Sequence, residues 1–548
     1  MTDSKKTGQL VIMRRTSSFS WDKDQFKNFV YYIDTQIVES SKVEVLNDCN
    51  LLDSYARGIR DKYSKWIYKI NDRFLDSKII KKDLSLFFLT DLSCKRTEIF
   101  DTFNSICNLL VIKEKIKGKK VTNAILVGVD VPFFSAFSSM FPEINATLIK
   151  QDVSKIKLIR MLVSDLIFLG ELFSIGLVNC FQKKRYNTSG KSGGRYLFSP
   201  YPQHLKPEIN GKEDIKYRGF ARKTDKYLVS ILMDGLHQHV SLREYVRLKN
   251  SLPSERFVLL DQSIHPLDVL TGLFWIIRCQ TYLLFKQNKK DTFLDIDISR
   301  YVKKELSVSF SRLPRLMMIE KQLRRFFKNE RVDELVYYLF EYPFGRLLSY
   351  VAGTVENRPH RIGFQHGPAS WIKMLYFLAP GEIAAKPPFL EQVPVPDKVL
   401  AEDLGSVEIY KYSGYSNIQI MENIYRLDYL ENVEINPTTK NVLIVPGLHD
   451  GRLLLAIMEQ FINDNPEITC YFRPHPRANN AYVSYFKNLM NLIVSTEPID
   501  ILMQQVSRIF VTYSSVGIEA KILGLEVTIV DIPGKLNESP LLDRRGGR

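Results

Sequence analysis

Residues 508–531 have the sequence RIFVTYSSVGIEAKILGLEVTIVD. The apolar start, RIFV, indicates a buried strand, VGIEAKILGL indicates a helix, and EVTIV indicates a second strand. Gly524 stands near the end of the helical segment, where glycine is typical of a helix C-terminus. The stretch therefore predicts a strand–helix–strand unit, in which the crossover helix makes the two strands parallel.

The same alternation extends backwards to residue 441. NVLIVPG indicates a strand with a glycine turn, RLLLAIMEQFINDNP an amphipathic helix, ITCYFRPHP a strand, NAYVSYFKNLMNL a helix, LIVSTEP a strand and IDILMQQVS a helix. Strands that alternate with helices in this way predict a doubly wound parallel sheet. Ligands of such sheets bind beyond the carboxyl ends of the strands, so the residues that follow each strand are the candidates for a site.

The composition is that of an ordinary globular protein with a basic balance. The chain has 548 residues, too many for one hydrophobic core, and carries 76 Lys plus Arg against 61 Asp plus Glu. The net charge of +15 favours an anionic partner, such as a phospholipid surface, a phosphorylated substrate or nucleic acid. The basic residues are scattered, so nucleic acid is not specifically indicated. The six cysteines form no CxxC pair, which argues against a zinc ribbon and fits a reducing compartment.

Three regions are expected along the chain. Residues 1–120 are predicted to be mixed and mainly helical, without a secretory pattern at the start. Residues 121–430 contain strand-like runs such as NAILVGVDVPFF, KYLVSILMDG and RFVLLDQS, and are predicted to form a Rossmann-like domain. Residues 441–548 form the second such domain. The apolar stretch 270–285 is interrupted by Arg278 and is shorter than the roughly 20 residues of a membrane helix, so it predicts a buried helix.

Two polar motifs follow strands of the C-terminal domain. The first is Arg473-Pro474-His475-Pro476-Arg477. Its prolines stiffen the backbone around the histidine, and its arginines can hold a phosphate or carboxylate. The second, TYSSVGIEA at 512–520, opens a helix, where hydroxyls and free backbone N–H groups form an anion site. A rigid loop with solvated arginines and simple N-capping by Ser514 or Ser515 are the structural alternatives.

The spacing of the two motifs is similar to that of a known group of enzymes. His475 precedes Ser514 by 39 positions (514 minus 475). A His-Pro motif followed by a paired-serine motif resembles the bacterial sialyltransferases, the Kdo transferases of capsule synthesis and, more distantly, the teichoic-acid polyol-phosphate polymerases. The resemblance implies an α/β, GT-B architecture, with two Rossmann-like domains facing a cleft. It also implies that His475, Ser514 and Ser515 hold the donor phosphate and that Glu519 contacts the donor nucleoside.

A candidate general base precedes this domain. His366, in Gly363-Phe364-Gln365-His366-Gly367, follows a predicted strand and can titrate near neutrality. An inverting transferase needs one base to deprotonate the acceptor hydroxyl. The polyol-phosphate polymerases resemble this stretch, whereas the sialyltransferases use an acidic D/E-D/E-G motif instead. Asp234, also after a predicted strand, is the second candidate, and His360 is expected at a strand edge.

The loop Pro446–Arg452 follows the first strand of the C-terminal domain. Its glycines, Gly447 and Gly451, would let the backbone approach the donor closely, although a tight turn between strand and helix explains them equally well. The spacing DxD occurs at 295–297, but at the flank of a helix. No metal is therefore expected, because basic residues and helix dipoles can stabilise a leaving phosphate.

These features together predict an inverting, metal-independent glycosyltransferase without a cofactor. The expected donor is a CMP-linked nonulosonic acid, such as sialic acid, or Kdo, and the acceptor is a surface polysaccharide or a lipid-linked glycan. A UDP- or GDP-sugar or a CDP-polyol phosphate is the alternative donor, and a non-catalytic GT-B-like scaffold is the rival function. The expected location is the cytoplasm, with peripheral contact to the anionic inner face of the membrane. Nucleic acid is not an expected partner.

Overall fold

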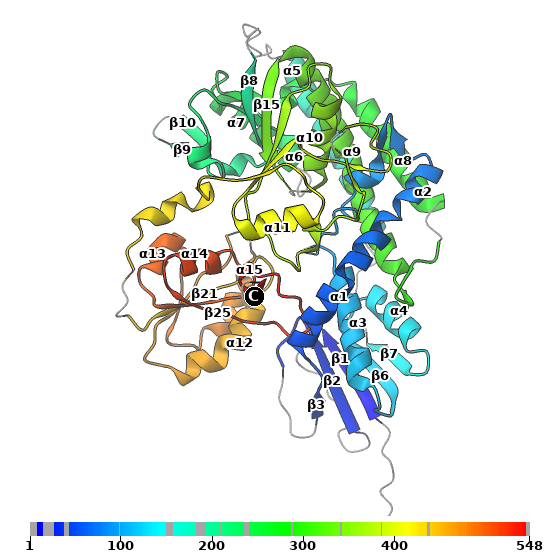
Figure 1. Cartoon of the computed structure of the whole chain (residues 1–548), viewed down its shortest axis with the longest axis vertical. Helices are drawn as coiled ribbons and strands as arrows, with labels where there is room; N and C mark the ends of the chain where they lie inside the picture. The colour runs from blue at the N-terminus through cyan, green and yellow to red at the C-terminus, as the bar shows by residue number, and fades with distance from the viewer. Residues whose placement is uncertain are drawn as a thin grey trace, which may run out of the picture.

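The structure is a computed structural model that describes residues 8–14, 27–37, 43–97, 99–149, 157–181, 193–208, 211–234, 240–285, 289–339, 342–384, 386–435, 439–476 and 478–543. Over these ranges, three parallel sheets of five, seven and five strands follow one another along the chain (Figure 1). Numbered by their order along the chain, the strands of all three sheets begin with the spatial order 3-2-1-4-5, the doubly wound order of dinucleotide-binding folds. The middle and C-terminal sheets are the two Rossmann-like units that the sequence predicts.

The first sheet was not foreseen. Its strands are β1 (Gly8–Arg14), β2 (Lys27–Ile33), β3 (Val43–Val45), β6 (Val121–Val127) and β7 (Asn145–Ile149). Its helices are α1 (Cys49–Tyr68), α2 (Asn71–Asp76), α3 (Thr102–Ile116) and α4 (Val131–Met140), and the described residues before 121 hold more helix than strand. Within the region predicted to be mainly helical, the segment at 27–33 is a strand, buried at residues 28–33. β6 pairs with β1, so the boundary expected at residue 120 falls inside this sheet.

The middle sheet runs from residue 194 to residue 420. Its strands are β8 (Gly194–Ser199), β11 (Lys226–Val229), β12 (Phe257–Leu259), β15 (Val332–Tyr338), β16 (His360–Phe364), β19 (Lys398–Ala401) and β20 (Ile418–Ile420). Its helices are α5 (Lys157–Phe181), α6 (Ile231–Asp234), α7 (Leu242–Ser251), α8 (Asp268–Phe285), α9 (Ser299–Asn329), α10 (Tyr342–Thr354) and α11 (Leu404–Tyr412). Every strand pairing in this sheet is parallel.

The C-terminal sheet confirms the predicted alternation. Its strands are β21 (Val442–Val445), β22 (Cys470–Phe472), β23 (Leu492–Val494), β24 (Arg508–Val511) and β25 (Glu526–Ile529). Its helices are α12 (Gly451–Asp464), α13 (Ile499–Met503), α14 (Val516–Ile522) and α15 (Pro540–Asp543). Val442 and Ile444 enter one hydrophobic cluster, and Leu443 and Val445 enter the other. Both faces of the strand are therefore buried, which explains its unbroken apolar sequence.

Two local predictions need correction. The segment NAYVSYFKNLMNL forms only a 3₁₀ turn, η7 (Ala481–Phe486), in place of a regular helix. The helix at 270–285 exists as α8, but its outward side is exposed: Leu270 retains 64% of its accessible surface and Phe285 75%. In the described ranges, one helix, the Val163–Phe181 part of α5, is long and apolar enough to cross a membrane, judged by length and composition alone.

The end of the chain returns to the first sheet. The backbone N–H of Asp34 donates to the Pro533 carbonyl (3.0 Å), and the Asn108 side chain donates to the Gly534 carbonyl (2.8 Å). Gly534 has a positive φ of 67°, and a Cβ there would lie 2.4 Å from the Tyr32 carbonyl oxygen, so only glycine fits this contact. The C-terminal segment therefore packs against the carboxyl edge of the first sheet.

Arg14 fills the rest of that edge. It ends β1 and is buried, with ion pairs to Asp101 (2.6 Å) and Asp34 (3.3 Å). A ligand of a doubly wound sheet would bind at this edge, but here the chain's own groups occupy it. A ligand site is therefore expected at the middle and C-terminal sheets.

Candidate functional site

The strand order of the C-terminal sheet reverses between β21 and β24. These neighbouring strands are hydrogen-bonded in parallel, and the loops that follow them meet. The N–H of Gly447 donates to the Thr512 hydroxyl (3.2 Å), which ties the two loops together. Doubly wound sheets bind their ligands at such a reversal point. The motif that contains Ser514 and Ser515 thus lies where a ligand of this sheet is expected.

Tyrosine side chains lie over the two glycines of the β21 loop. A Cβ on Gly447 would lie 2.2 Å from the ring of Tyr513, and a Cβ on Gly451 would lie 2.0 Å from the Tyr482 hydroxyl oxygen. A larger residue at either position would have to displace a tyrosine side chain. The close approach is made by the protein's own side chains.

The His-Pro motif lies at the same edge of the sheet. β22 pairs with β21 on the side opposite β24, so the loops that contain His475 and Ser514 flank the β21 loop. The His475 carbonyl accepts the N–H of Ala478 (2.9 Å), which closes a turn, and the Arg473 guanidinium donates to the Glu497 carbonyl (2.7 Å). His475 is partly exposed and Pro476 is exposed. Arg477 lies outside the described residues.

The paired serines begin α14 and are partly exposed. Ser515 occupies the N-cap position without making a capping hydrogen bond, and its hydroxyl lies 3.4 Å from a Glu519 carboxylate oxygen. The Ser514 hydroxyl accepts the N–H of Val516 at 3.4 Å, a long contact. Strong N-capping, the structural alternative for this motif, is therefore not what these hydroxyls do.

Glu519 belongs to a network that joins the two Rossmann-like domains. Its carboxylate is buried, accepts the Tyr429 hydroxyl (2.6 Å) and lies 3.7 Å from the Arg426 guanidinium. The same guanidinium donates two bonds to Glu402, of 2.7 and 2.9 Å. Glu402 follows β19 of the middle sheet, whereas Arg426 and Tyr429 lie in the connecting 3₁₀ segment η6 (Tyr425–Asn432). The carboxyl ends of the two sheets thus meet through Arg426.

His366 follows β16 on the middle-domain side of this junction. Its ring stacks on Tyr338, with centroids 4.5 Å apart and an angle of 22° between the planes. Burial, reinforced by the charges of Lys216, Lys373 and Arg426, holds the pKa of His366 well below its ordinary value of 6.5. The imidazole is therefore neutral at physiological pH, the form that can accept a proton.

Gln365 fixes the turn that presents His366. Its side-chain amide donates to the Gly367 carbonyl (2.8 Å) and to the Ser406 hydroxyl (3.0 Å), and its carbonyl oxygen accepts the N–H of Glu402 (3.0 Å). The glutamine that replaces an acidic residue of the sialyltransferase pattern is thus engaged with the backbone. Its role is to hold the histidine in place.

The other candidates are placed less favourably. Asp234 is the last residue of the short helix α6, one turn beyond β11, and its side chain lies outside the described residues. His360 is the exposed first residue of β16, 4.0 Å from Glu334, as expected for a strand edge. Over the described ranges, no group of three or more His, Cys, Asp or Glu side chains is placed to hold a metal ion.

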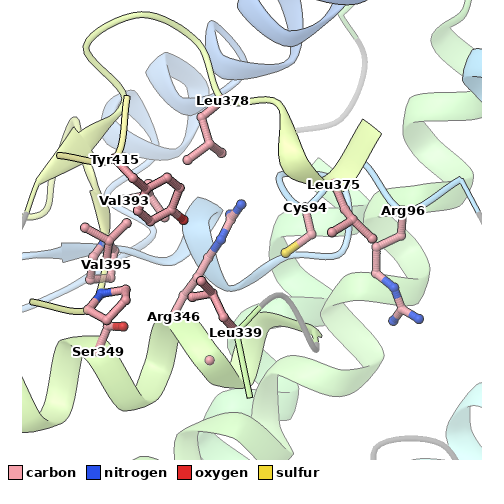
Figure 2. A pocket seen from close by; sticks show the side chains of 13 residues that line it. Cys94, Arg96, Leu339, Arg346, Ser349, Leu375, Leu378, Val393, Val395 and Tyr415 are labelled. Atoms are coloured by element: carbon pink, nitrogen blue, oxygen red, sulfur yellow. The ribbon is translucent and has the colours of Figure 1, made fainter. Parts of the chain in front are cut away.

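A separate enclosed cavity lies between the N-terminal region and the middle domain (Figure 2). Cys94, Arg346, Val393 and Tyr415 are among its lining residues. Its volume of about 30 Å³ is enough for a few water molecules but not for a nucleotide. Arg346 is already engaged by the Ser93 hydroxyl (2.7 Å) and the Phe88 carbonyl (3.2 Å). This cavity is a packing gap and not the donor site.

Sequence reasoning missed the cations around His366. Lys216, Lys373 and Arg426 come from three distant segments, and no local motif marks them. Arg426 and Tyr429 are three residues apart, so in a helical turn their side chains lie on the same side and can reach one common partner. Both reach Glu519, so the pair could have been recognised as a contact across the domains.

Comparisons with known proteins add limited information. No protein-family model matches the chain, and no curated protein matches it. Among solved structures, it is similar to UGT89C1 from Arabidopsis thaliana, at 10% identity, covering 64% of this chain and 83% of that one, with a TM-score of 0.36. It is also similar to a UDP-GlcNAc 2-epimerase from Neisseria meningitidis, at 12% identity, covering 61% and 81%, with a TM-score of 0.33.

A third similar structure is the wall teichoic acid polymerase TagF, at 10% identity, covering 69% of this chain and 79% of that one, with a TM-score of 0.28. All three TM-scores are below 0.5, so the fold description rests on the strand order of this chain itself. Two Rossmann-like sheets whose carboxyl ends meet at Arg426 make up the α/β, GT-B-like architecture that the sequence predicts.

Proposed function

We propose that this chain is an inverting glycosyltransferase that moves a sugar from a nucleotide-linked donor to a hydroxyl of a glycan or lipid-linked acceptor. One observation carries the proposal: a histidine kept neutral by burial, reinforced by nearby cations, follows a middle-sheet strand at the junction with the reversal point of the second sheet. Such a transfer needs a neutral base that takes the proton of the acceptor hydroxyl and positive charge that stabilises the leaving phosphate.

The proposed chemistry assigns a role to each side of the junction. The acceptor hydroxyl gives its proton to His366, and its oxygen bonds to the anomeric carbon. The bond from that carbon to the donor phosphate breaks, and its electron pair leaves with the nucleotide. Lys216 and Lys373 attract the anionic donor and stabilise the charge that develops on the leaving phosphate, whereas Arg426 stays paired with Glu402 and Glu519. No metal ion is needed for these steps.

The donor is assigned to the C-terminal sheet. The turn at His475 and the hydroxyls of Ser514 and Ser515 flank the reversal point, where the phosphate would lie, with Arg473 near them. Glu519 can contact the nucleoside only if its carboxylate gives up the hydrogen bond from the Tyr429 hydroxyl and accepts one from the nucleoside. The preferred donor is CMP-linked nonulosonic acid or Kdo, on the resemblance of the two motifs. The Gln-His-Gly turn favours a CDP-polyol phosphate as the second candidate.

A panel of nucleotides tests the donor assignment. CMP, CDP, UDP and GDP are each added to the full chain, and the melting temperature is measured. A ligand at about 100 times its dissociation constant adds roughly 2.7 kcal/mol of stability, which shifts the transition measurably. CMP or CDP should stabilise and the others should not. Stabilisation by UDP or GDP alone would show that the donor is a UDP- or GDP-sugar and not a CMP- or CDP-linked one. Nucleotide binding without turnover of any sugar donor that carries the same nucleotide would support a non-catalytic scaffold.

Variants of three positions test the base. His366→Ala should lower turnover by roughly 10²–10⁴-fold with donor affinity unchanged, because the base touches the acceptor. His360→Ala is the matched control, since this histidine is exposed at the start of the same strand. Normal turnover in His366→Ala together with collapse in Asp234→Ala would transfer the role to Asp234.

A further inference from the structure

The outer sides of α5 and α8 form an apolar surface. In the described part of the chain, 25 large hydrophobic side chains are exposed, and 13 of them lie at 163–181 or 267–285. On α8 they are Leu270, Leu273, Phe274, Ile277, Leu284 and Phe285, at the spacing of one helix side. Surface helices of a monomer do not normally leave such a stripe unburied, so it is built to contact something.

The two helices make one continuous layer. Gly272 of α8 packs on Leu169 and Leu172 of α5, and Asp165 near the start of α5 accepts a hydrogen bond from Gln280 near the end of α8. The helices therefore run antiparallel, side by side. At 1.5 Å per residue, α8 with its 18 residues is about 27 Å long and α5 with its 25 residues is about 37 Å long.

The described acidic side chains of this layer are buried, and Arg278 lies on its outward side. Asp165 and Glu171 on α5 and Asp268 on α8 are buried, whereas Arg278 is partly exposed. Glu171 pairs with Arg315 of α9 (2.7 Å), and Asp268 with Arg325 (2.6 Å). In the described stretches 163–181 and 268–285, the outward side thus has one charged group, a cation.

Further cations border the layer. Arg278 donates to the Lys78 carbonyl (2.5 Å), which places the exposed Lys78 beside α8, and the exposed Lys289 and Lys290 follow the helix. A groove of about 370 Å³, lined by Ile79, Phe274, Ile277, Phe285 and Arg278, opens between α8 and the loop at residue 78. An apolar surface with cations at its border is complementary to an anionic bilayer, whose phosphates meet the cations while the acyl region accepts the apolar side chains.

We propose that the outer sides of α5 and α8 are a lipid-docking surface that holds the protein on an anionic bilayer. α5 docks without crossing, because its buried Glu171 is fixed to α9 and its Asn179 donates to the Asp261 and Ile264 carbonyls (2.9 and 3.0 Å). α8 lies on the side of the molecule remote from the C-terminal domain (Figure 1). The inference does not rest on the proposed reaction, since docking requires no nucleotide.

Vesicle flotation of the full chain tests the proposal. Vesicles of phosphatidylcholine with 30% phosphatidylglycerol (a proportion of roughly one anionic lipid in three, enough for a negative surface potential) are compared with pure phosphatidylcholine. The wild type should float with the anionic vesicles. Leu270→Ser/Phe274→Ser/Ile277→Ser should bind roughly 100-fold more weakly, because three apolar side chains leave the interface. Arg278→Gln should lose roughly fivefold, on anionic vesicles only.

The control is Leu404→Ser/Met490→Ser/Ile501→Ser, which removes three exposed apolar side chains from other surfaces and should float like the wild type. Leu166→Ser/Phe173→Ser repeats the test on α5, so one of the two variants still tests the docking surface if the other misfolds. A wild type that ignores anionic vesicles, or serine variants that float normally, would overturn the proposal. A concentration-dependent dimer that the serine variants abolish, without vesicle binding, would assign the surface to contact between copies.

Discussion

Replacement of Arg426 by Met tests the junction between the two Rossmann-like domains. The Arg426 side chain is 8% exposed, and those of its partners Glu402 and Glu519 are 3% and 9% exposed. Removal of the cation leaves two buried carboxylates without their counter-ion, and breaking a buried ion pair from one side costs roughly 3–5 kcal/mol. Because Glu519 keeps its bond from Tyr429, we expect about 3 kcal/mol, the lower end of that range.

The assay is urea unfolding of Arg426→Met beside a matched exposed pair. Arg57→Met breaks a pair with Asp53 in which both side chains are 37% exposed, and should cost roughly 0–1 kcal/mol. Adding Glu402→Gln and Glu519→Gln to Arg426→Met should restore at least half of the loss, because no unpaired charge then remains buried.

The same substitution links the junction to the candidate base. Arg426 is one of the cations that lower the pKa of His366, so Arg426→Met should raise that pKa, as measured by an NMR titration of the imidazole. A loss of less than 1 kcal/mol together with an unmoved histidine titration would refute the reasoning.

Three further outcomes are expected. Burial raises the pKa of Glu305 to about 8, so the native state keeps a proton that the unfolded chain releases near pH 4.3, and stability falls as pH rises between these values. Glu305→Gln should therefore gain stability relative to wild type by roughly 1.4 kcal/mol per pH unit in that window, and an equal effect in urea melts at pH 5 and pH 8 would contradict this. Turnover should persist below pH 6.5 and decline only as His366 is protonated at lower pH; a half-maximal rate at pH 6.5 would exclude it as the base. His475→Ala and Ser514→Ala should each weaken nucleotide binding by roughly 1–3 kcal/mol in calorimetry with the fold retained, and unchanged affinity in both would place the anion site elsewhere.

The C-terminal sheet was predictable because each of its strands is followed closely by its own helix or turn. Local apolar runs and end signals suffice for such units: Gly524, with a φ of 80°, ends α14 where the sequence places the C-terminus. In the first sheet, β6 is followed by α4 and its sequence is strand-like, but its partner β1 lies more than a hundred residues away in the chain. The local sequence around either strand therefore does not indicate that they share a sheet.

The candidate site was predictable only in part, for the same physical reason. The loops after β22 and β24 could be inferred because strand ends of one sheet lie at one edge. The lowered pKa of His366 could not, because it depends on burial and on cations from segments that only the tertiary fold brings together. Gly447 shows the same limit: the ring of Tyr513 lies where its Cβ would be, a contact that no spacing rule reveals.

The return of the C-terminal segment to the first sheet restricts how the molecule can open. The C-terminal domain is attached at η6 and again where Pro533 and Gly534 meet Asp34 and Asn108. A body pinned at two points keeps one axis of rotation, the line through both pins. A movement of this domain that kept both attachments would be a rotation about that line, in which η6 and residues 533–534 move least.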